Sequence, residues 1–490
     1  MVPRTLAPAP RLDSPIESQG LEIFFRRTGP QLAGYFETSL FQGSALQLSL
    51  SEPVIRHTLA ALGLLHHQAG LGKLRSENEV PAFKKSIQLY NRAIGALRER
   101  VAADPGGTPV VAMTNVLFIC FEYFQGNRRL AISHLQGGIA ILRSWRQTHG
   151  AAPKLPGGDE RYGSADSYFL EKEVAPLLSS FNTTQNILST FSFAHQAQGF
   201  KLGDRSDPLR PGSVFLNSVD ADGQALFADR FESLHESKVA LVDLVTSIVW
   251  PHRNIEPELT RGRSANDDAS LVYNQALDRW QATFQDLARR RKPQWDQRKE
   301  QMAKVVEIMN RCVEFGRISA MARHESDWDA HRHKYEELAE LAESFAANES
   351  HDLGEFSGTM CLDFGMVFTL HIATWKCRWP RLRRRTLDLL RRLAQREWLF
   401  DMEYLNAIFA RIIEFEEASL GLPAGMVPDE NVLPLEHARI HQFSVVGHTR
   451  SSGGSFGCSV ILYSKPQGPD GPWHAVTEFL QLPLLRQRLN

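Results

Sequence analysis

The chain has few cysteines, and they lie far apart. Its 490 residues include only Cys120, Cys312, Cys361, Cys377 and Cys458, without a single C-x-x-C pair. This pattern excludes a disulfide framework and the zinc ribbons or fingers that closely spaced cysteines mark. We therefore expect a reducing compartment, no bound metal and no cofactor.

The sequence also lacks an excess of positive charge and a long hydrophobic run. Its 55 basic residues face 56 acidic ones, whereas a nucleic-acid-binding domain usually shows an excess of Lys and Arg. The most apolar run, residues 109–124, is interrupted by Thr114, Asn115 and Glu122 and is shorter than the roughly 18 residues that a membrane span needs. The average charge thus gives no sign of nucleic-acid binding, and we expect a buried central helix and no membrane association.

One motif resembles a catalytic signature. The segment "GGSFG" at 453–457 fits the G-x-S-x-G nucleophile elbow, and Asp470 and His474 follow it in hydrolase order. An elbow needs a strand before the serine and a helix after it. Strand-like sequence flanks this segment on both sides, so we interpret it as a hairpin loop.

The histidines near the N-terminus lie on a predicted scaffold helix. Ser51 is expected to cap this helix, with Pro53 in the first turn. His57 is expected to fall opposite the packed face, and the adjacent pair His66 and His67 to split between its edges. We expect no metal or catalytic site there.

The other histidine and carboxylate groups give no better candidate. His331 and His333 are two apart and point away from each other on a helix, and His437 and His441 lie in strand-like sequence. The acidic segment "EFEE" at 414–417 is expected to be a solvated helix face. The sequence thus predicts no catalytic residue.

Apolar residues recur at helical spacing up to about residue 420. The stripe through residues 83–101 and the segment 128–146 predict antiparallel hairpins around the buried run. Gly137 and Gly138 inside the latter predict close approach of a neighbouring helix. Further helices are expected at about 170–197, 222–250, 267–290, 294–323, 327–347, 355–377, 380–397 and 401–419.

The resulting fold prediction is an all-α bundle of antiparallel helical hairpins with a small C-terminal β-hairpin or three-stranded flap. We expect a flexible tail at 1–20, helical hairpins at 21–147, a loop at 148–167, a helical regulatory core at 168–420 and the β-rich flap at 421–490.

Two basic runs depart from the neutral average. They contain Arg289, Arg290, Arg291 and Lys292 in the first, and Arg381, Arg383, Arg384 and Arg385 in the second. Such runs can bind nuclear import receptors. The alternative is a solvated face beside acidic neighbours such as Asp388, Glu397 and Asp401. Neither run lies in a recognisable DNA-binding element, so we expect no DNA contact from them.

An ordered set of blocks resembles the regulatory region of fungal zinc-cluster transcription factors. The blocks are "FFRRTGPQLAGYFE" (24–37), "LQLSLSEPVIRHTLAALGLLHH" (46–67), "LYNRAIGALRERVA" (89–102), "VLFICFEYFQGNRRLAISHLQGGIAIL" (116–142), "CRWPRLRRRTLDLLRRLAQREWLFDM" (377–402) and "ILYSKPQGPDGPWHAVTEF" (461–479). The family's six-cysteine zinc cluster is not among these residues, so no zinc ligand or base-reading contact can be carried over. The resemblance therefore implies a helical regulatory domain without autonomous DNA binding.

The resemblance implies a transcription-associated regulatory protein in the nucleus of a filamentous fungus. It would act through protein partners, such as a transcription factor or another subunit, or through a small-molecule effector, on a secondary-metabolite gene cluster. Two alternatives stay open. One is an enzyme or small-molecule-binding protein, nuclear or cytoplasmic, that reuses this helical scaffold in a biosynthetic pathway. The other is a gene model from which the zinc cluster has been lost.

Overall fold

The computed structural model describes residues 14–34, 36, 39–70, 80–104, 107–125, 127–149, 164–190, 229–253, 264–348, 366–393, 402–423, 425–450, 456–468 and 470–481. The chain divides into two compact units. Met1–Asn182 and Glu355–Asp363 form the first, and Thr183–Gly354 and Phe364–Asn490 form the second. The division falls inside one helix, Ala175–Thr190.

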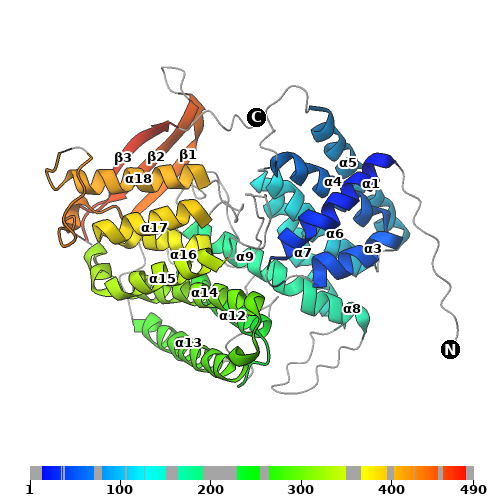
Figure 1. Ribbon diagram of the computed structural model, residues 1–490, viewed down its shortest axis with the longest axis horizontal. Coiled ribbons are helices and arrows are strands. Elements are labelled where there is room, and N and C mark those ends of the chain that lie inside the picture. Colours follow the sequence, from blue (N-terminus) through cyan, green and yellow to red (C-terminus); the bar gives the residue numbers. More distant parts are fainter. Residues whose placement is uncertain are drawn as a thin grey trace. The chain divides into compact units, whose positions relative to one another are not determined.

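The first unit is helical (Figure 1). Its α-helices are α1 (Pro15–Ile23), α2 (Gly29–Ala33), α3 (Ala45–Ser51), α4 (Pro53–Gly70), α5 (Val80–Ala103), α6 (Thr108–Phe124), α7 (Arg128–His149), α8 (Ala165–Tyr168) and α9 (Ala175–Thr190). Helix α4 packs on α5, and α6 packs on α7. The predicted buried helix is α6, in which every residue from Ala112 to Tyr123 is buried.

The N-terminal helices begin and end at positions that differ from the prediction. Helix α1 starts at Pro15, with the Ser14 side chain accepting a hydrogen bond from the Glu17 N–H, so the predicted tail to residue 20 is too long. The prediction that Ser51 caps α4 was wrong. This serine is the last residue of α3, and Glu52 in extended conformation separates the two helices because Pro53 disfavours a helical residue before it.

Glycines allow close helix packing at α1 and α4. A Cβ at Gly63 would lie 2.0 Å from the backbone oxygen of Gly20, and one at Gly20 would lie 2.4 Å from the backbone oxygen of Ala60. At Gly138 of α7 the neighbour is a side chain, since a Cβ would meet Leu178 Cδ2 at 3.2 Å. The glycines at which the backbones of two helices approach each other closely are therefore in α1 and α4, and the sequence interpretation did not identify them.

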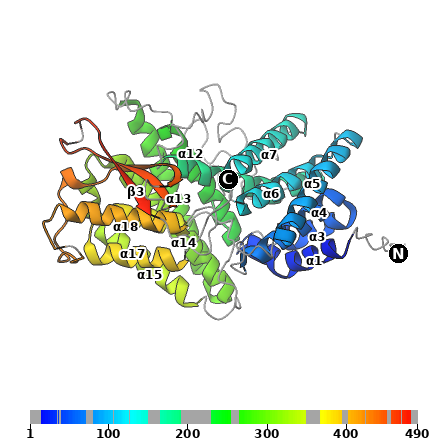
Figure 2. The same ribbon diagram turned by 90° about the horizontal axis from the view of Figure 1, so that it is seen from above.

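The second unit combines helices with a small sheet. Its described elements include α12 (Leu234–Arg253), α13 (Ser264–Arg291), α14 (Gln297–Met321), α15 (Arg332–Asn348), α16 (Met366–Lys376), α17 (Pro380–Leu393), α18 (Met402–Ala418), β1 (Gln442–Arg450), β2 (Phe456–Ser464) and β3 (His474–Gln481). Figure 1 shows these helices stacked from α13 past α12 and α14 to α17 and α18, and Figures 1 and 2 both show α18 beside the sheet. The predicted all-α fold with a three-stranded flap is confirmed.

The sheet is antiparallel in the order β1-β2-β3. One face is apolar and buried, with Cys458, Val460 and Leu462 of β2 at its centre. The ring centroid of Phe443 in β1 lies 5.3 Å from that of Trp375 and 5.9 Å from that of Phe409. The sheet is thus fixed to α16 and α18 by an aromatic core.

Candidate functional site

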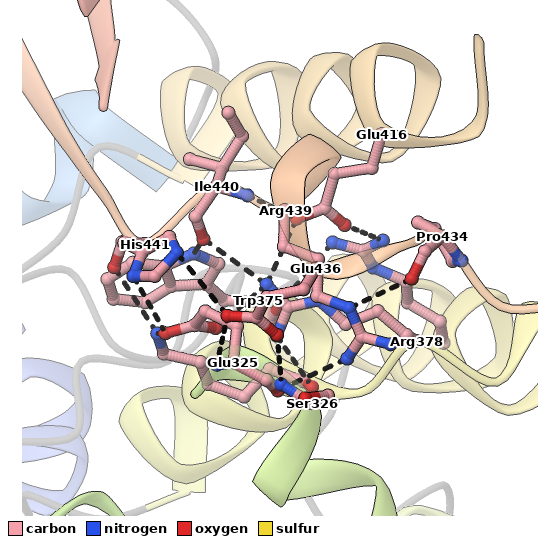
Figure 3. A network of polar contacts seen from close by, with 12 residues as sticks. Glu325, Ser326, Trp375, Arg378, Glu416, Pro434, Glu436, Arg439, Ile440 and His441 are labelled. Carbon is pink, nitrogen blue, oxygen red and sulfur yellow. Dashed lines mark hydrogen bonds and ion pairs between the residues drawn. The ribbon is translucent and has the colours of Figure 1, made fainter. Parts of the chain in front are cut away.

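The most concentrated polar chemistry in the second unit is a buried group of ion pairs (Figure 3). We call it the arginine–carboxylate network. It contains Glu325, Asp329, Lys376, Arg378, Arg383, Glu416, Glu436 and Arg439. Its members come from the 3₁₀ turn Glu325–His331, from α16 to α18, and from the segment 434–441 before β1.

Glu416 lies at one centre of the network. Helix α18 places it fully inside the unit, 0% exposed. Its carboxylate accepts hydrogen bonds from Arg378 Nη2 at 3.0 Å, Arg383 Nη1 at 2.6 Å and the Ile440 backbone N–H at 2.8 Å. Burial alone would raise the pKa of Glu416, but the charges of Arg378 and Arg383 lower it to about 2. Glu416 is therefore ionised and bound between two arginines.

Glu325 forms the second centre. Its carboxylate lies 2.6 Å from Lys376 Nζ and 3.0 Å from Arg378 Nη2, so Arg378 bridges the two carboxylates. Burial lowers the pKa of Lys376, and the adjacent Glu325 carboxylate opposes this shift. The Lys376 ammonium also lies 4.1 Å from the ring centroid of Trp375, a cation–π contact.

The segment before β1 is tied into the network by two residues. Glu436 accepts hydrogen bonds from the backbone N–H groups of Glu325 and Ser326, at 2.8 and 2.7 Å, and so caps the 3₁₀ turn. Arg439 pairs with Asp329 through two nitrogens, at 2.9 and 2.7 Å, and donates to the Pro434 carbonyl. The network thus joins the sheet's leading segment to the helices.

The arrangement is suited to holding elements together. Its four cationic and four anionic side chains are matched, and each carboxylate is bound by a cationic group or by backbone N–H donors. In the part of the chain that the structure describes, no three His, Cys, Asp or Glu residues lie close enough to bind a metal ion. The geometry supports a structural tie, because buried charges that neutralise one another are already satisfied.

Comparison with known families gives a match over part of the chain. Residues 25–241 match the fungal specific transcription factor domain. The resemblance of the sequence blocks between residues 24 and 142 to the regulatory region of fungal transcription factors is thereby confirmed, and the domain supports a role in transcription regulation. The match covers the described helices of the first unit from the first π-helical turn, Phe24–Thr28, onward and the start of α12. No curated protein and no solved structure matches the chain.

The arginine–carboxylate network lies outside the fungal transcription factor domain match, as do both basic runs. In the second run, Arg383 is buried on Glu416, Arg384 binds Glu417 at 2.8 and 2.6 Å, and Arg385 binds Glu343. Of the four arginines in this run, Arg381 is the one that is exposed and that forms no side-chain ion pair with a described residue. The interpretation of this run as a solvated face is wrong for Arg383, because a carboxylate distant in sequence covers it.

The first run lies at the surface. Arg289 is 77% exposed, and Arg291 pairs with Glu232 at 2.9 Å although both are exposed. Arg290 donates to the Phe231 carbonyl at 2.7 Å. Lys292 begins the 3₁₀ turn that follows α13 and is exposed. This run therefore presents basic groups to solvent.

Three expectations about acidic and histidine residues require correction. Glu416 was expected on a solvated face, yet it is the most deeply bound carboxylate of the network. His57 does not face solvent. It is buried with its Nδ1 3.0 Å from the Glu17 carboxylate, which also pairs with Arg56. His66 is buried too, and its Nδ1 lies 2.9 Å from the Thr28 hydroxyl.

The remaining motifs behave as expected, differ from the expectation or lie outside the described residues. Of the segment 453–457, residues 453–455 are not among those described. Gly457 lies in β2, and β1 pairs antiparallel with β2 from Arg450 opposite Phe456, so strands flank the segment on both sides. His437 and His441 were expected in a strand, but His437 lies in the 3₁₀ turn Glu436–Ala438 and His441 directly precedes β1, with its ring 4.0 Å from the Glu325 carboxylate. No helix of the described chain is long and apolar enough to cross a membrane.

Proposed function

We propose that this protein is a nuclear regulator of transcription that acts through contacts with other proteins. The observation that carries the proposal is the match of residues 25–241 to the fungal specific transcription factor domain. A partner transcription factor or another subunit would bind its helical surface, and a small-molecule effector is a further candidate ligand. The targets proposed from the resemblance are genes of a secondary-metabolite cluster.

Transcript profiling after gene deletion tests the regulatory role. Deletion should change the transcript levels of a coherent set of genes, and reintroduction of the full chain should restore them. Unchanged transcripts together with exclusion of a tagged protein from the nucleus would contradict the proposal. Unchanged transcripts with the loss of one biosynthetic product would instead favour the enzyme alternative.

For nuclear entry we propose the first basic run. Arg289, Arg291 and Lys292 are exposed at the end of α13, and clustered basic side chains of this kind bind import receptors. The second run supports this role less well, because Arg383 and Arg384 are held by carboxylates of α18.

A matched pair of variants tests the assignment. Combined Arg289→Ala, Arg291→Ala and Lys292→Ala substitutions should lower the nuclear-to-cytoplasmic ratio of a fluorescent fusion severalfold. The control, Arg381→Ala with Arg385→Ala, removes exposed or half-exposed charges from the second run and should leave the ratio unchanged. Exposed ion pairs contribute little to stability, so both variants should fold. An equal loss of nuclear signal in both variants would refute the choice of run.

A further inference from the structure

Strand β3 is an edge strand of the described sheet. It pairs with β2 along its whole length, from His474 opposite Ser464 to Gln481 opposite Gly457, and no described residue pairs with its other side. The exposure of the β3 side chains agrees with an edge position. Inward-facing residues of β2 such as Val460 are fully buried, whereas their neighbours Val476, Glu478 and Leu480 on β3 are only half-buried. A row of backbone N–H and C=O groups is therefore presented for pairing.

The β3 edge lacks the bulges, lysines and prolines that often protect an edge strand. Its sequence, "HAVTEFLQ", contains no proline, glycine or lysine, and its register with β2 is regular. The opposite edge, β1, is interrupted by an irregularity between Val445 and Gly447. Protected edges typically have bulges, lysines or prolines. The one charge on β3, Glu478, faces α18 and is neutralised by Arg411.

The outward face of β3 is complementary to itself. Ala475, Thr477 and Phe479 lie on this face and are exposed, with Phe479 at 38%. The Phe479 ring covers Gly457 of β2, where an added Cβ would lie 2.5 Å from Phe479 Cζ, so the ring is held on the sheet. A small residue and a large aromatic are thus placed at equal distances on either side of Thr477.

We propose that β3 pairs antiparallel with β3 of a second copy of this chain, about a two-fold axis at Thr477, to form a continuous six-stranded sheet. Opposed residues in an antiparallel pair share a face, so the axis must pass through a residue position. At Thr477 each Phe479 lies opposite Ala475 of the second copy, and the two threonines meet. If the axis instead passed through Glu478, two carboxylates would oppose each other. If it passed through Val476, the two strands would overlap over fewer residues. The dimer does not depend on the proposed transcriptional role.

Charge substitution at the axis tests the dimer in the full chain. Sedimentation velocity over a range of concentrations should show a monomer–dimer equilibrium. Thr477→Lys and Thr477→Glu should each raise the dissociation constant about tenfold or more, because like charges would meet at the axis. An equimolar mixture of the two variants should restore dimers. Thr148→Lys, at an exposed position of α7, introduces the same charge elsewhere and should have no effect.

Cross-linking tests the register. Thr477→Cys places two thiols directly opposite each other, within the Cα separation that a disulfide requires, and mild oxidation should give a covalent dimer. Gln481→Cys lies on the same face but not opposite itself and should not cross-link, nor should the wild-type chain. A monomeric wild-type protein at all concentrations, or dimers insensitive to Thr477→Lys, would overturn the proposal. Equal cross-linking at both positions would overturn the axis.

Discussion

Removal of the Glu416 charge should strongly destabilise the second unit. Glu416→Gln preserves the shape of the side chain but leaves Arg378 and Arg383 buried beside a neutral amide, although both guanidinium groups are at most 1% exposed. Loss of one partner from a buried ion pair typically costs about 3–5 kcal/mol. The pKa of Glu416, lowered to about 2 by the arginines despite burial, corresponds to a contribution of about 3 kcal/mol relative to an unfolded glutamate.

The assay is urea unfolding followed by tryptophan fluorescence. The chain has nine tryptophans, and Trp145 is the only one in the first unit, so the signal reports on the second. Glu414→Gln is the matched control. This glutamate, also on α18, pairs with Arg411, and the two side chains are 65% and 39% exposed, so its loss should cost less than about 1 kcal/mol. Equal costs for both variants, or less than about 1 kcal/mol for Glu416→Gln, would refute the assignment of a buried, charged Glu416.

The pH dependence follows from the same pKa. Because the folded pKa of Glu416 is below the unfolded one, its stabilisation is fully present above about pH 5 and is lost as the pH falls toward 2. The difference in unfolding free energy between the wild type and Glu416→Gln should therefore shrink over this range. A difference that stays constant down to about pH 2 would show that the carboxylate charge is not its source.

Two further substitutions test packing in the first unit by thermal and urea unfolding. Gly63→Ala should lower the free energy of unfolding by about 1–3 kcal/mol or more, because its Cβ would meet the Gly20 backbone oxygen at 2.0 Å. The control Gly95→Ala, with no neighbour within 4 Å, should be neutral or slightly stabilising. Equal effects of the two substitutions would contradict the close contact. Tyr90→Phe removes the 2.8 Å hydrogen bond from the Tyr90 hydroxyl to Glu122, a carboxylate whose pKa is raised by burial. The free energy of unfolding should fall by about 1–3 kcal/mol. An unchanged unfolding midpoint would exclude that hydrogen bond.

Local sequence patterns predicted the helices and strands because those elements depend on short-range periodicity. The apolar run at 109–124 became the buried helix α6, and the alternating C-terminal segments became β1 to β3. The break at Glu52 was missed, although Pro53 offered a local signal for it. The division of the chain inside α9 has no such signal, since it depends on which helices pack together over long sequence distances.

The sequence analysis missed the arginine–carboxylate network because it considered how many charged residues each segment contains and not which face of the helix they lie on. In α18, Glu416 follows Ile412 and Ile413 at helical spacing, and in α17 Arg383 lies in line with Thr386 and Leu390. A charged residue on the apolar face of each of two helices indicates a buried pair, because neither charge can be buried alone. That signal was present in the sequence. The participation of Glu325 and Arg439 was not, since those residues lie in irregular segments whose positions depend on tertiary packing.

Three consecutive arginines show why a basic run is a poor guide to an accessible basic surface. Helix α17 turns by roughly 100° per residue, so Arg383, Arg384 and Arg385 point in different directions. The first is buried on Glu416, and the other two bind Glu417 and Glu343 at the surface. An import receptor that reads a run of side chains would have to break the folded unit to reach Arg383, at the cost of the same buried pair. The folded structure therefore favours the run at the end of α13, where no arginine is bound to a buried carboxylate.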